Sequence, residues 1–184
     1  AGHGEFPRAI FAPGTHQQCY DLMRRAVEIA HKHQTPVILL TDQFLQDMQK
    51  NSPRLDETYR PVERHVVQAG EDYRRYAMTA DGVSPRAIPG GEARVVCDSD
   101  GHDEDGHITE DLGVHVAQYD KRLRKEAGLV ADAVAPELYG PPEAPTLLMC
   151  WGSTYGPCRE AVDQLIAAGK PTAMLHFSQV WPLD

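Results

Sequence analysis

Carboxylates and imidazoles, two common kinds of metal-binding side chain, crowd into one stretch of the chain. Its members are Asp98, Asp100, His102, Asp103, Glu104, Asp105, His107, Glu110 and Asp111. A divalent ion is one interpretation, because these groups ligate such ions. The spacing matches neither an EF-hand loop nor the His-Glu-x-x-His pattern of zinc hydrolases. We therefore predict a solvated acidic loop that holds no metal. A metal-dependent hydrolase site over 98–111 and docking to a partner subunit are the alternatives.

A second candidate is an arginine in the middle of a rigid loop. Residues 81–90 are Asp-Gly-Val-Ser-Pro-Arg-Ala-Ile-Pro-Gly. The two prolines restrict the backbone and lower the entropy cost of holding one shape. A guanidinium held in this way could bind a carboxylate through two parallel hydrogen bonds. The alternative is a structural loop in which Arg86 pairs with an internal acid.

A third candidate is the turn formed by Gly152, Ser153 and Thr154. It follows an apolar run and precedes a helical pattern. Backbone amides at such a helix N-terminus can bind phosphate or another anion. Neither the dinucleotide fingerprint Gly-x-Gly-x-x-Gly nor a phosphate-binding P-loop is present. The turn is therefore a candidate anion site, with a plain strand-to-helix turn as the alternative.

Composition and charge exclude several functions. The formal net charge is -9, and no stripe of lysine and arginine offers a face to nucleic acid or to an anionic membrane. The apolar runs are too short to span a bilayer. A chain that is 41% hydrophobic and 24% charged can form a packed core. We expect neither a nucleic-acid nor a membrane partner.

The four cysteines, Cys19, Cys97, Cys150 and Cys158, form no Cys-x-x-Cys pair. Iron–sulfur clusters and structural zinc sites usually need such closely spaced thiolates. Without a secretory pattern in front of the first element, the cysteines are best interpreted as free thiols in a reducing compartment. This interpretation predicts a cytoplasmic protein.

The first 50 residues are patterned as part of an α/β domain. Thr15 can cap a helix, with Gln18 at the partner position of a capping box and an apolar stripe behind it. Pro36 ends that helix. The continuous apolar run Val37–Leu40 is typical of a strand buried in a parallel sheet. Polar residues 41–43 follow it, at the edge where open α/β sheets bind ligands.

The last 41 residues also show the pattern of an α/β domain. Leu147–Trp151 and Thr172–Phe177 are apolar strands separated by a helical pattern over Arg159–Ala168. Strand, helix and strand at this spacing predict a βαβ unit. A single βαβ unit cannot cover both faces of its sheet, so both chain ends are interpreted as cuts in a larger protein.

Between these parts the pattern loosens and prolines punctuate it. We predict short strands at Val66–Val67 and Arg94–Cys97 and a helix over 110–127. A stretch of this length with little structure is uncommon within one compact domain. The chain is therefore divided into residues 1–50, a connector over 51–143, and residues 144–184. We expect the two flanking strand runs to lie in separate parallel sheets.

Six segments resemble one known family, the alpha subunits of 2-oxoacid:ferredoxin oxidoreductases, and most closely the 2-oxoglutarate type. The segments are GHGEFPR at 2–8 with APGT at 12–15, TPVILLTDQ at 35–43, DGVSPRAIPG at 81–90, DSDGHDEDGHITED at 98–111, WGSTYG at 151–156 and VWP at 180–182. The resemblance covers nearly the whole chain. It implies an α/β fold with open parallel sheets: the end of a thiamine-diphosphate pyrimidine domain, then the start of a transketolase-C-like domain.

The resemblance also implies an activity and its partners. Such enzymes decarboxylate a 2-oxoacid oxidatively to an acyl-coenzyme A, using thiamine diphosphate and magnesium, and pass electrons through iron–sulfur clusters to ferredoxin. The beta subunit of the hetero-oligomer holds the diphosphate, the magnesium and a cluster. The glutamate that activates the cofactor has no counterpart here, so the catalytic residue is unassigned and the fragment alone is expected to be inactive. His3, Ser84 and Arg86 are the substrate or cofactor-cleft candidates. A non-catalytic assembly module is the alternative function.

Overall fold

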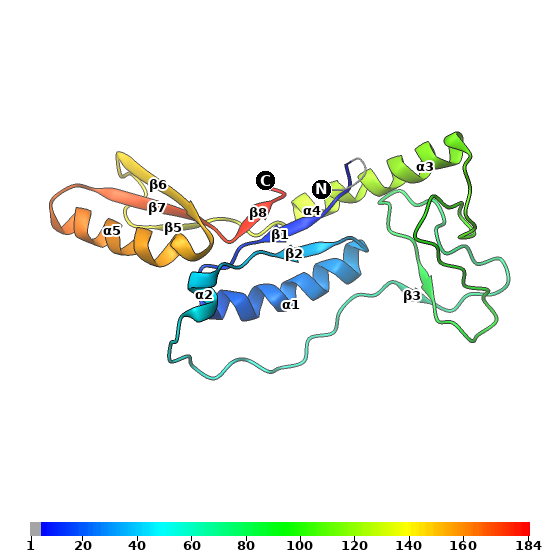
Figure 1. Cartoon of the computed structure of the whole chain (residues 1–184), viewed down its shortest axis with the longest axis horizontal. Helices are drawn as coiled ribbons and strands as arrows, with labels where there is room; N and C mark the ends of the chain where they lie inside the picture. The colour runs from blue at the N-terminus through cyan, green and yellow to red at the C-terminus, as the bar shows by residue number, and fades with distance from the viewer. Residues whose placement is uncertain (1–4) are drawn as a thin grey trace.

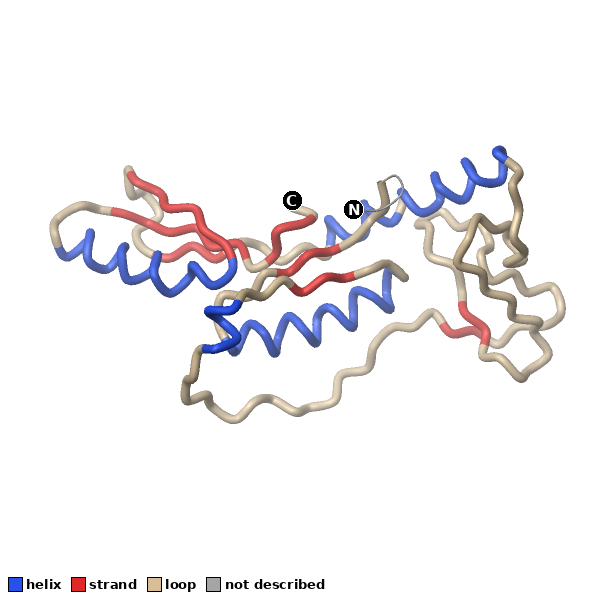
Figure 2. Tube along the Cα trace, viewed as in Figure 1, coloured by secondary structure: helices blue, strands red, loops and turns tan. Residues whose placement is uncertain are grey.

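The computed structural model describes residues 5–184, and their strands form three small sheets joined by long loops (Figure 1). Each of two sheets packs against one long helix, and the third is a two-stranded ladder within the middle of the chain. Figure 2 shows that most of the chain between the first and last helices is loop. No helix within the described residues is long and apolar enough to cross a membrane.

The first sheet has the order β2-β1-β8. Strands β1 (Ala9–Phe11) and β2 (Val37–Leu39) pair in parallel, and β8 (Gln179–Trp181) pairs antiparallel with β1. Helix α1 (His16–His33) covers this sheet (Figure 1). The apolar stripe predicted for the helix forms the core, whose buried members are Ala9, Phe11, Leu22, Ala26, Ile29 and Leu129.

The first turn of α1 is capped as expected, with one difference. Thr15 Oγ1 accepts a hydrogen bond from the Gln18 amide at 3.1 Å. The Gln18 side chain accepts from the amide of Gly14 at 2.8 Å, rather than from that of Thr15 as in a capping box. At the other end, Gln34 adopts a left-handed conformation, with φ of 48°, and Pro36 follows.

The second sheet has the order β5-β7-β6. Strands β6 (Thr146–Trp151) and β7 (Thr172–Phe177) pair in parallel, and α5 (Tyr155–Ala167) connects them, which confirms the predicted βαβ unit. Strand β5 (Glu137–Tyr139) joins antiparallel. Val162 of α5 packs on Cys150 and Met174. The two apolar runs thus lie in separate sheets, and each parallel pair gains one antiparallel strand that was not predicted.

The middle of the chain contains short elements only. After α2 (Gln43–Asp47) the chain runs extended to β3 (Val66–Val67), which pairs in parallel with β4 (Arg86–Ala87). The strand predicted at Val66–Val67 is confirmed. The strand predicted at Arg94–Cys97 is wrong, because that segment is loop.

The helix predicted over 110–127 is instead two helices, α3 (Leu112–Leu123) and α4 (Lys125–Ala131). Asp111 starts α3 by accepting the Val114 amide at 2.9 Å. Leu129 of α4 is buried in the core of the first sheet. Asp132, which follows α4, accepts hydrogen bonds from Lys32 at 2.7 Å and from His33 at 2.6 Å. The predicted connector therefore returns to α1 and contributes to its core.

Candidate functional site

Ser84 is held by structural hydrogen bonds within the 81–90 loop. Its side chain is 3% exposed, and its hydroxyl donates to the Ala77 carbonyl at 3.0 Å. Its carbonyl accepts the Gln34 side-chain amide at 2.5 Å. A buried hydroxyl that already donates to a carbonyl serves the shape of the loop. Ser84 therefore ties this loop to the end of α1.

Arg86 lies on β4 and faces a histidine instead of an acid. Its Nη1 lies 3.1 Å from His31 Nδ1, and its Nε is buried without a hydrogen-bond partner among the described residues. Burial and the nearby charge of Arg75 lower the pKa of Arg86 from its ordinary value. Because no described carboxylate lies within 4.0 Å, the internal acid that a purely structural loop would supply is not present. The orphaned Nε leaves Arg86 with donor capacity to spare.

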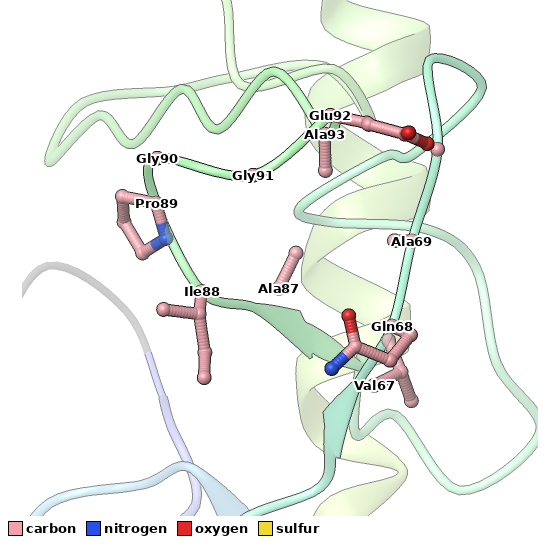
Figure 3. A pocket seen from close by; sticks show the side chains of 11 residues that line it. Val67, Gln68, Ala69, Ala87, Ile88, Pro89, Gly90, Gly91, Glu92 and Ala93 are labelled. Carbon is pink, nitrogen blue, oxygen red and sulfur yellow. The ribbon is translucent and has the colours of Figure 1, made fainter.

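The second half of the 81–90 loop lines an open groove of about 720 Å³. Figure 3 shows the segment Ala87–Ala93 facing the segment Val67–Gly70 across it. Gln68 and Glu92 are the only polar side chains among the lining residues, and Ile88 is 65% exposed. This groove offers no cation to an acidic substrate.

A different cavity, of about 540 Å³, lies beside Ser84 and between the 81–90 loop and α3. We call it the basic cavity, because the cationic residues that line it are Arg75, Lys121, Arg122 and Lys125. Gly82 closes one wall: its φ is +80°, and a Cβ there would overlap the Lys121 carbonyl oxygen. The sequence offered only a weak signal for this cavity, in the basic last turn of the predicted helix. A basic last turn is ordinary in itself, since positive charge suits the carbonyl end of a helix dipole.

The candidate anion-binding turn, Gly152–Thr154, is a short 3-10 helix that leads directly into α5. The Ser153 hydroxyl donates to the carboxylate of Asp42, and Thr154 Oγ1 donates to the Trp151 carbonyl at 2.5 Å. The hydrogen bond from Ser153 is the main reason that the pKa of Asp42 lies below its ordinary value. A carboxylate thus already lies beside this turn, which favours the plain-turn interpretation over a site for a free anion.

Asp42 and Ser153 join the two main sheets, and a buried histidine missed by the sequence analysis lies beside them. His176 on β7 is 1% exposed, and its Nε2 lies 3.1 Å from the Gly152 carbonyl oxygen. A Cβ on Gly14 would lie 2.6 Å from that same oxygen and 2.8 Å from His176 Nε2. This close approach explains Gly14 in the Ala-Pro-Gly-Thr segment, whereas Gly152 in the Trp-Gly-Ser-Thr segment is explained by its positive φ of 58°.

The acidic 98–111 stretch uses its carboxylates for turns and local hydrogen bonds. Asp103 accepts the His107 amide at 2.9 Å, and Glu104 accepts the Met78 amide at 2.9 Å. The His102 ring stacks on Tyr76 with a centroid distance of 3.7 Å. Among residues 5–184, no three metal-ligating side chains are gathered for an ion. The geometry favours the solvated loop over the hydrolase site.

His3, the remaining sequence candidate, lies outside the described residues. Of the other candidates, Ser84 and Arg86 share one loop, whereas Ser153 lies at the junction between the two main sheets. The sequence candidates therefore do not form one site.

Comparison with known proteins gives a consistent result. Residues 3–121 match the family model described as "Pyruvate flavodoxin/ferredoxin oxidoreductase, thiamine diP-bdg". The chain is 36% identical over 173 residues to subunit alpha of 2-oxoacid:ferredoxin oxidoreductase 1 of Sulfurisphaera tokodaii, covering 89% of the chain and 27% of that protein. It is 29% identical over 188 residues to 2-oxoglutarate oxidoreductase subunit KorA of Mycobacterium tuberculosis, covering 98% of the chain and 28% of that protein.

One solved structure matches nearly the whole fold. It is the 2-oxoglutarate:ferredoxin oxidoreductase from Magnetococcus marinus, solved with 2-oxoglutarate, coenzyme A and succinyl-CoA bound. The TM-score is 0.84 at 28% identity, over 98% of the chain and 32% of that structure's chain. The chain thus spans about a third or less of the length of each of these three relatives.

Proposed function

Because the chain belongs to the pyruvate flavodoxin/ferredoxin oxidoreductase family, we propose that it forms part of the alpha subunit of a 2-oxoacid:ferredoxin oxidoreductase. The observation that carries the proposal is the match of 98% of the chain to one such enzyme with a TM-score of 0.84. The proposed reaction is the oxidative decarboxylation of a 2-oxoacid to an acyl-coenzyme A. The electrons pass to ferredoxin through clusters on the beta subunit.

The proposed substrate is 2-oxoglutarate. The Mycobacterium and Magnetococcus relatives support it, since both are 2-oxoglutarate enzymes. A 2-oxoglutarate enzyme must recognise a second carboxylate that pyruvate lacks. Arg86 is our candidate for that contact, because its guanidinium pairs with no carboxylate among the described residues.

Thiamine diphosphate and magnesium complete the proposed complex, and the described residues fit only part of that role. We assign the magnesium–diphosphate end to the beta subunit, as the resemblance of the chain to alpha subunits of such enzymes implies. Thiamine diphosphate, when bound, stabilises the carbanion left by decarboxylation. This chain's contribution is a rigid wall, formed by the 81–90 loop, that positions substrate. We place the hetero-oligomer in the cytoplasm.

A non-catalytic assembly role is the second candidate. An apolar row on β6, formed by Leu147, Met149 and Trp151, favours it, because those side chains point away from α5 and are 49%, 68% and 57% exposed. Such a row suits burial against another part of a larger assembly.

Activity of the complete complex tests the proposal. The full-length parent subunit and its beta subunit would be co-expressed, and coenzyme A-dependent ferredoxin reduction measured with 2-oxoglutarate, pyruvate and 2-oxoisovalerate. We expect the highest kcat/KM with 2-oxoglutarate. Activity with another 2-oxoacid alone would keep the family role and reject the substrate. An assembled, cofactor-loaded complex that is inactive with all three would favour the assembly role.

A further inference from the structure

Four cations surround the basic cavity, although the chain as a whole carries a formal net charge of -9. They come from two segments: Arg75 from the loop before the 81–90 motif, and Lys121, Arg122 and Lys125 from the adjoining ends of α3 and α4 (Figure 1). We propose that the basic cavity binds the phosphate groups of a ligand that carries at least two negative charges.

Three of these cations donate hydrogen bonds to neutral oxygen atoms, and Arg75 and Lys121 also lie over the Tyr76 ring, 5.0 Å and 6.0 Å from its centroid. Lys121 is 3% exposed, and its Nζ donates to the Tyr76 carbonyl at 2.7 Å. Lys125 Nζ donates to the Gln34 carbonyl at 2.7 Å, and Arg75 Nη2 donates to the Gln34 side chain at 3.2 Å. Within residues 5–184, none of the four cations that line the cavity forms an ion pair. Burying a charge without a counter-charge is costly, so this arrangement calls for an anion.

The cations also repel one another. Burial, followed by the charges of Lys125 and Arg75, lowers the pKa of Lys121 to about 8. Burial and the charges of Arg75, Arg122 and Arg86 lower the pKa of Lys125 to about 8. A bound anion would relieve this repulsion.

The acids nearest to the cavity are fewer than its cations, and among the described residues none of them forms an ion pair with those cations. Asp98 lines it, but its carboxylate accepts the Asp100 amide at 2.8 Å. Glu104 accepts the Met78 amide and contacts Arg74, and Asp81 accepts the Val83 amide at 3.0 Å. The local excess of positive charge therefore persists after these carboxylates are counted.

The number and types of cations indicate the ligand class. A single carboxylate would leave most of four positive charges uncompensated, whereas a diphosphate or a phosphomonoester brings several. Arginine offers paired donors to phosphate oxygens, and lysine offers a compact charge. The Gly82 approach to α3 and the Ser84 hydrogen bonds fix the opposite wall, so the cations are held in place before a ligand arrives.

Inorganic pyrophosphate is the first probe, because it contains only the phosphate groups that the cavity is proposed to bind. Its binding to the full-length parent subunit would be measured by isothermal titration calorimetry, without magnesium. The test variants are Lys121→Met and Arg122→Gln, and the matched control is Lys170→Gln, an exposed lysine between α5 and β7. We expect at least a tenfold weaker Kd for Lys121→Met, several-fold weakening for Arg122→Gln, and no change for the control.

Arg122 is only half-buried, so its variant keeps the test decisive if Lys121→Met does not fold. Unchanged affinity in every folded variant, or no binding to the wild-type subunit, would overturn the proposal. If pyrophosphate binds the isolated subunit but is excluded from the complex, an acidic segment of the partner occupies the cavity, and the small-ligand proposal is rejected.

A second arm identifies the source of the phosphate, using coenzyme A and dephospho-coenzyme A. Testing coenzyme A rests on the proposed function, but pyrophosphate binding does not. A complex that binds pyrophosphate at this cavity yet turns over no 2-oxoacid retains the anion site and loses the proposed function. The reverse result retains the function and loses the site.

Discussion

At the scale of single residues, Asp132 connects α4 to α1. Its carboxylate accepts hydrogen bonds from Lys32 and His33, and its Oδ1 lies 3.5 Å from Nη2 of Arg25. Burial alone would raise the pKa of this carboxyl group. The hydrogen bonds from Lys32 and His33 outweigh that effect, so the pKa lies below its ordinary value of 3.8. The group therefore contributes stability above about pH 4 that is lost as pH falls through its folded-state pKa.

We expect Asp132→Asn to loosen α4 without unfolding the protein. Loss of a charged hydrogen-bond acceptor costs about 1–3 kcal/mol, which corresponds to roughly five- to 150-fold faster amide exchange if α4 opens locally. Hydrogen exchange of residues 125–131, read by mass spectrometry at pH 7, measures it. The difference between variant and wild type should shrink at pH 3. An equal difference at both pH values would show that charge is not the cause.

Alanine substitutions at two glycines would distinguish the cost of backbone strain from the cost of steric overlap. Gly82 and Gly90 both have positive φ, at +80° and +95°, but a Cβ would overlap the Lys121 carbonyl only at Gly82 and would meet nothing within 4 Å at Gly90. Gly90→Ala should cost about 1–2 kcal/mol through strain alone. Gly82→Ala should cost more, and should also weaken pyrophosphate binding. Thermal unfolding of the full-length subunit compares them, and equal shifts in Tm would contradict the packing of this loop on α3.

Variants of Arg86 test the proposed contact with the substrate directly. In the complete complex, Arg86→Ala should lower kcat/KM for 2-oxoglutarate, because loss of a buried charged contact costs about 2–5 kcal/mol. Arg86→Lys should restore part of the activity, since charge is kept while the paired donors are lost. Steady-state kinetics decide the point. Unchanged kcat/KM with normal assembly would make Arg86 structural.

At the scale of elements, the sequence predicted what depends on local pattern. The cap at Thr15, the apolar face of α1 and the βαβ unit all follow from spacing within one element. The antiparallel strands β5 and β8 were not predicted, because each is defined by pairing with a strand that is distant in sequence. The basic cavity escaped for the same reason: Arg75 and Lys121 meet only after the chain has folded back.

Among residues 5–184, a helix packs on one face of the second sheet, and the other face of β6 is exposed. Leu148 and Cys150 face α5, whereas the alternate positions on β6 form the exposed apolar row. We expect the remainder of the full-length subunit to cover that row. Met149 is 68% exposed here and Met23 is 53% exposed, so Met149 should oxidise faster if nothing covers it.

Limited oxidation with hydrogen peroxide tests this cover. In the full-length subunit, Met149 should form sulfoxide more slowly than Met23, measured by mass spectrometry of peptides. Met174, which is fully buried on β7, serves as the protected reference. Faster oxidation of Met149 than of Met23 would mean that the apolar row stays exposed in the intact subunit.

At the scale of the whole molecule, the described residues supply only part of the proposed active site. The described residues supply a rigid loop and a basic cavity, while a magnesium–diphosphate site is assigned to the beta subunit. The division into residues 1–50, 51–143 and 144–184 stays a prediction, and α4 shows that the middle part contributes to the first core.

We expect the 184-residue chain alone to turn over no 2-oxoglutarate. A cofactor held at only one end gains too little contact to offset its lost translational and rotational freedom. Calorimetry with thiamine diphosphate and the ferredoxin reduction assay check this, with the complete complex as positive control. Turnover by the isolated chain would overturn the assignment of the diphosphate site to another subunit.

The contact among Gly14, the Gly152 carbonyl and His176 has an evolutionary consequence. Any side chain at Gly14 would press on a backbone atom of a segment that lies far away in the sequence. We therefore expect the Ala-Pro-Gly-Thr and Trp-Gly-Ser-Thr segments to change together among homologues, although the whole middle of the chain separates them. Among homologues, a lineage that replaces Gly14 should also show an altered residue at position 176, whose side chain meets it, and a shifted backbone at position 152.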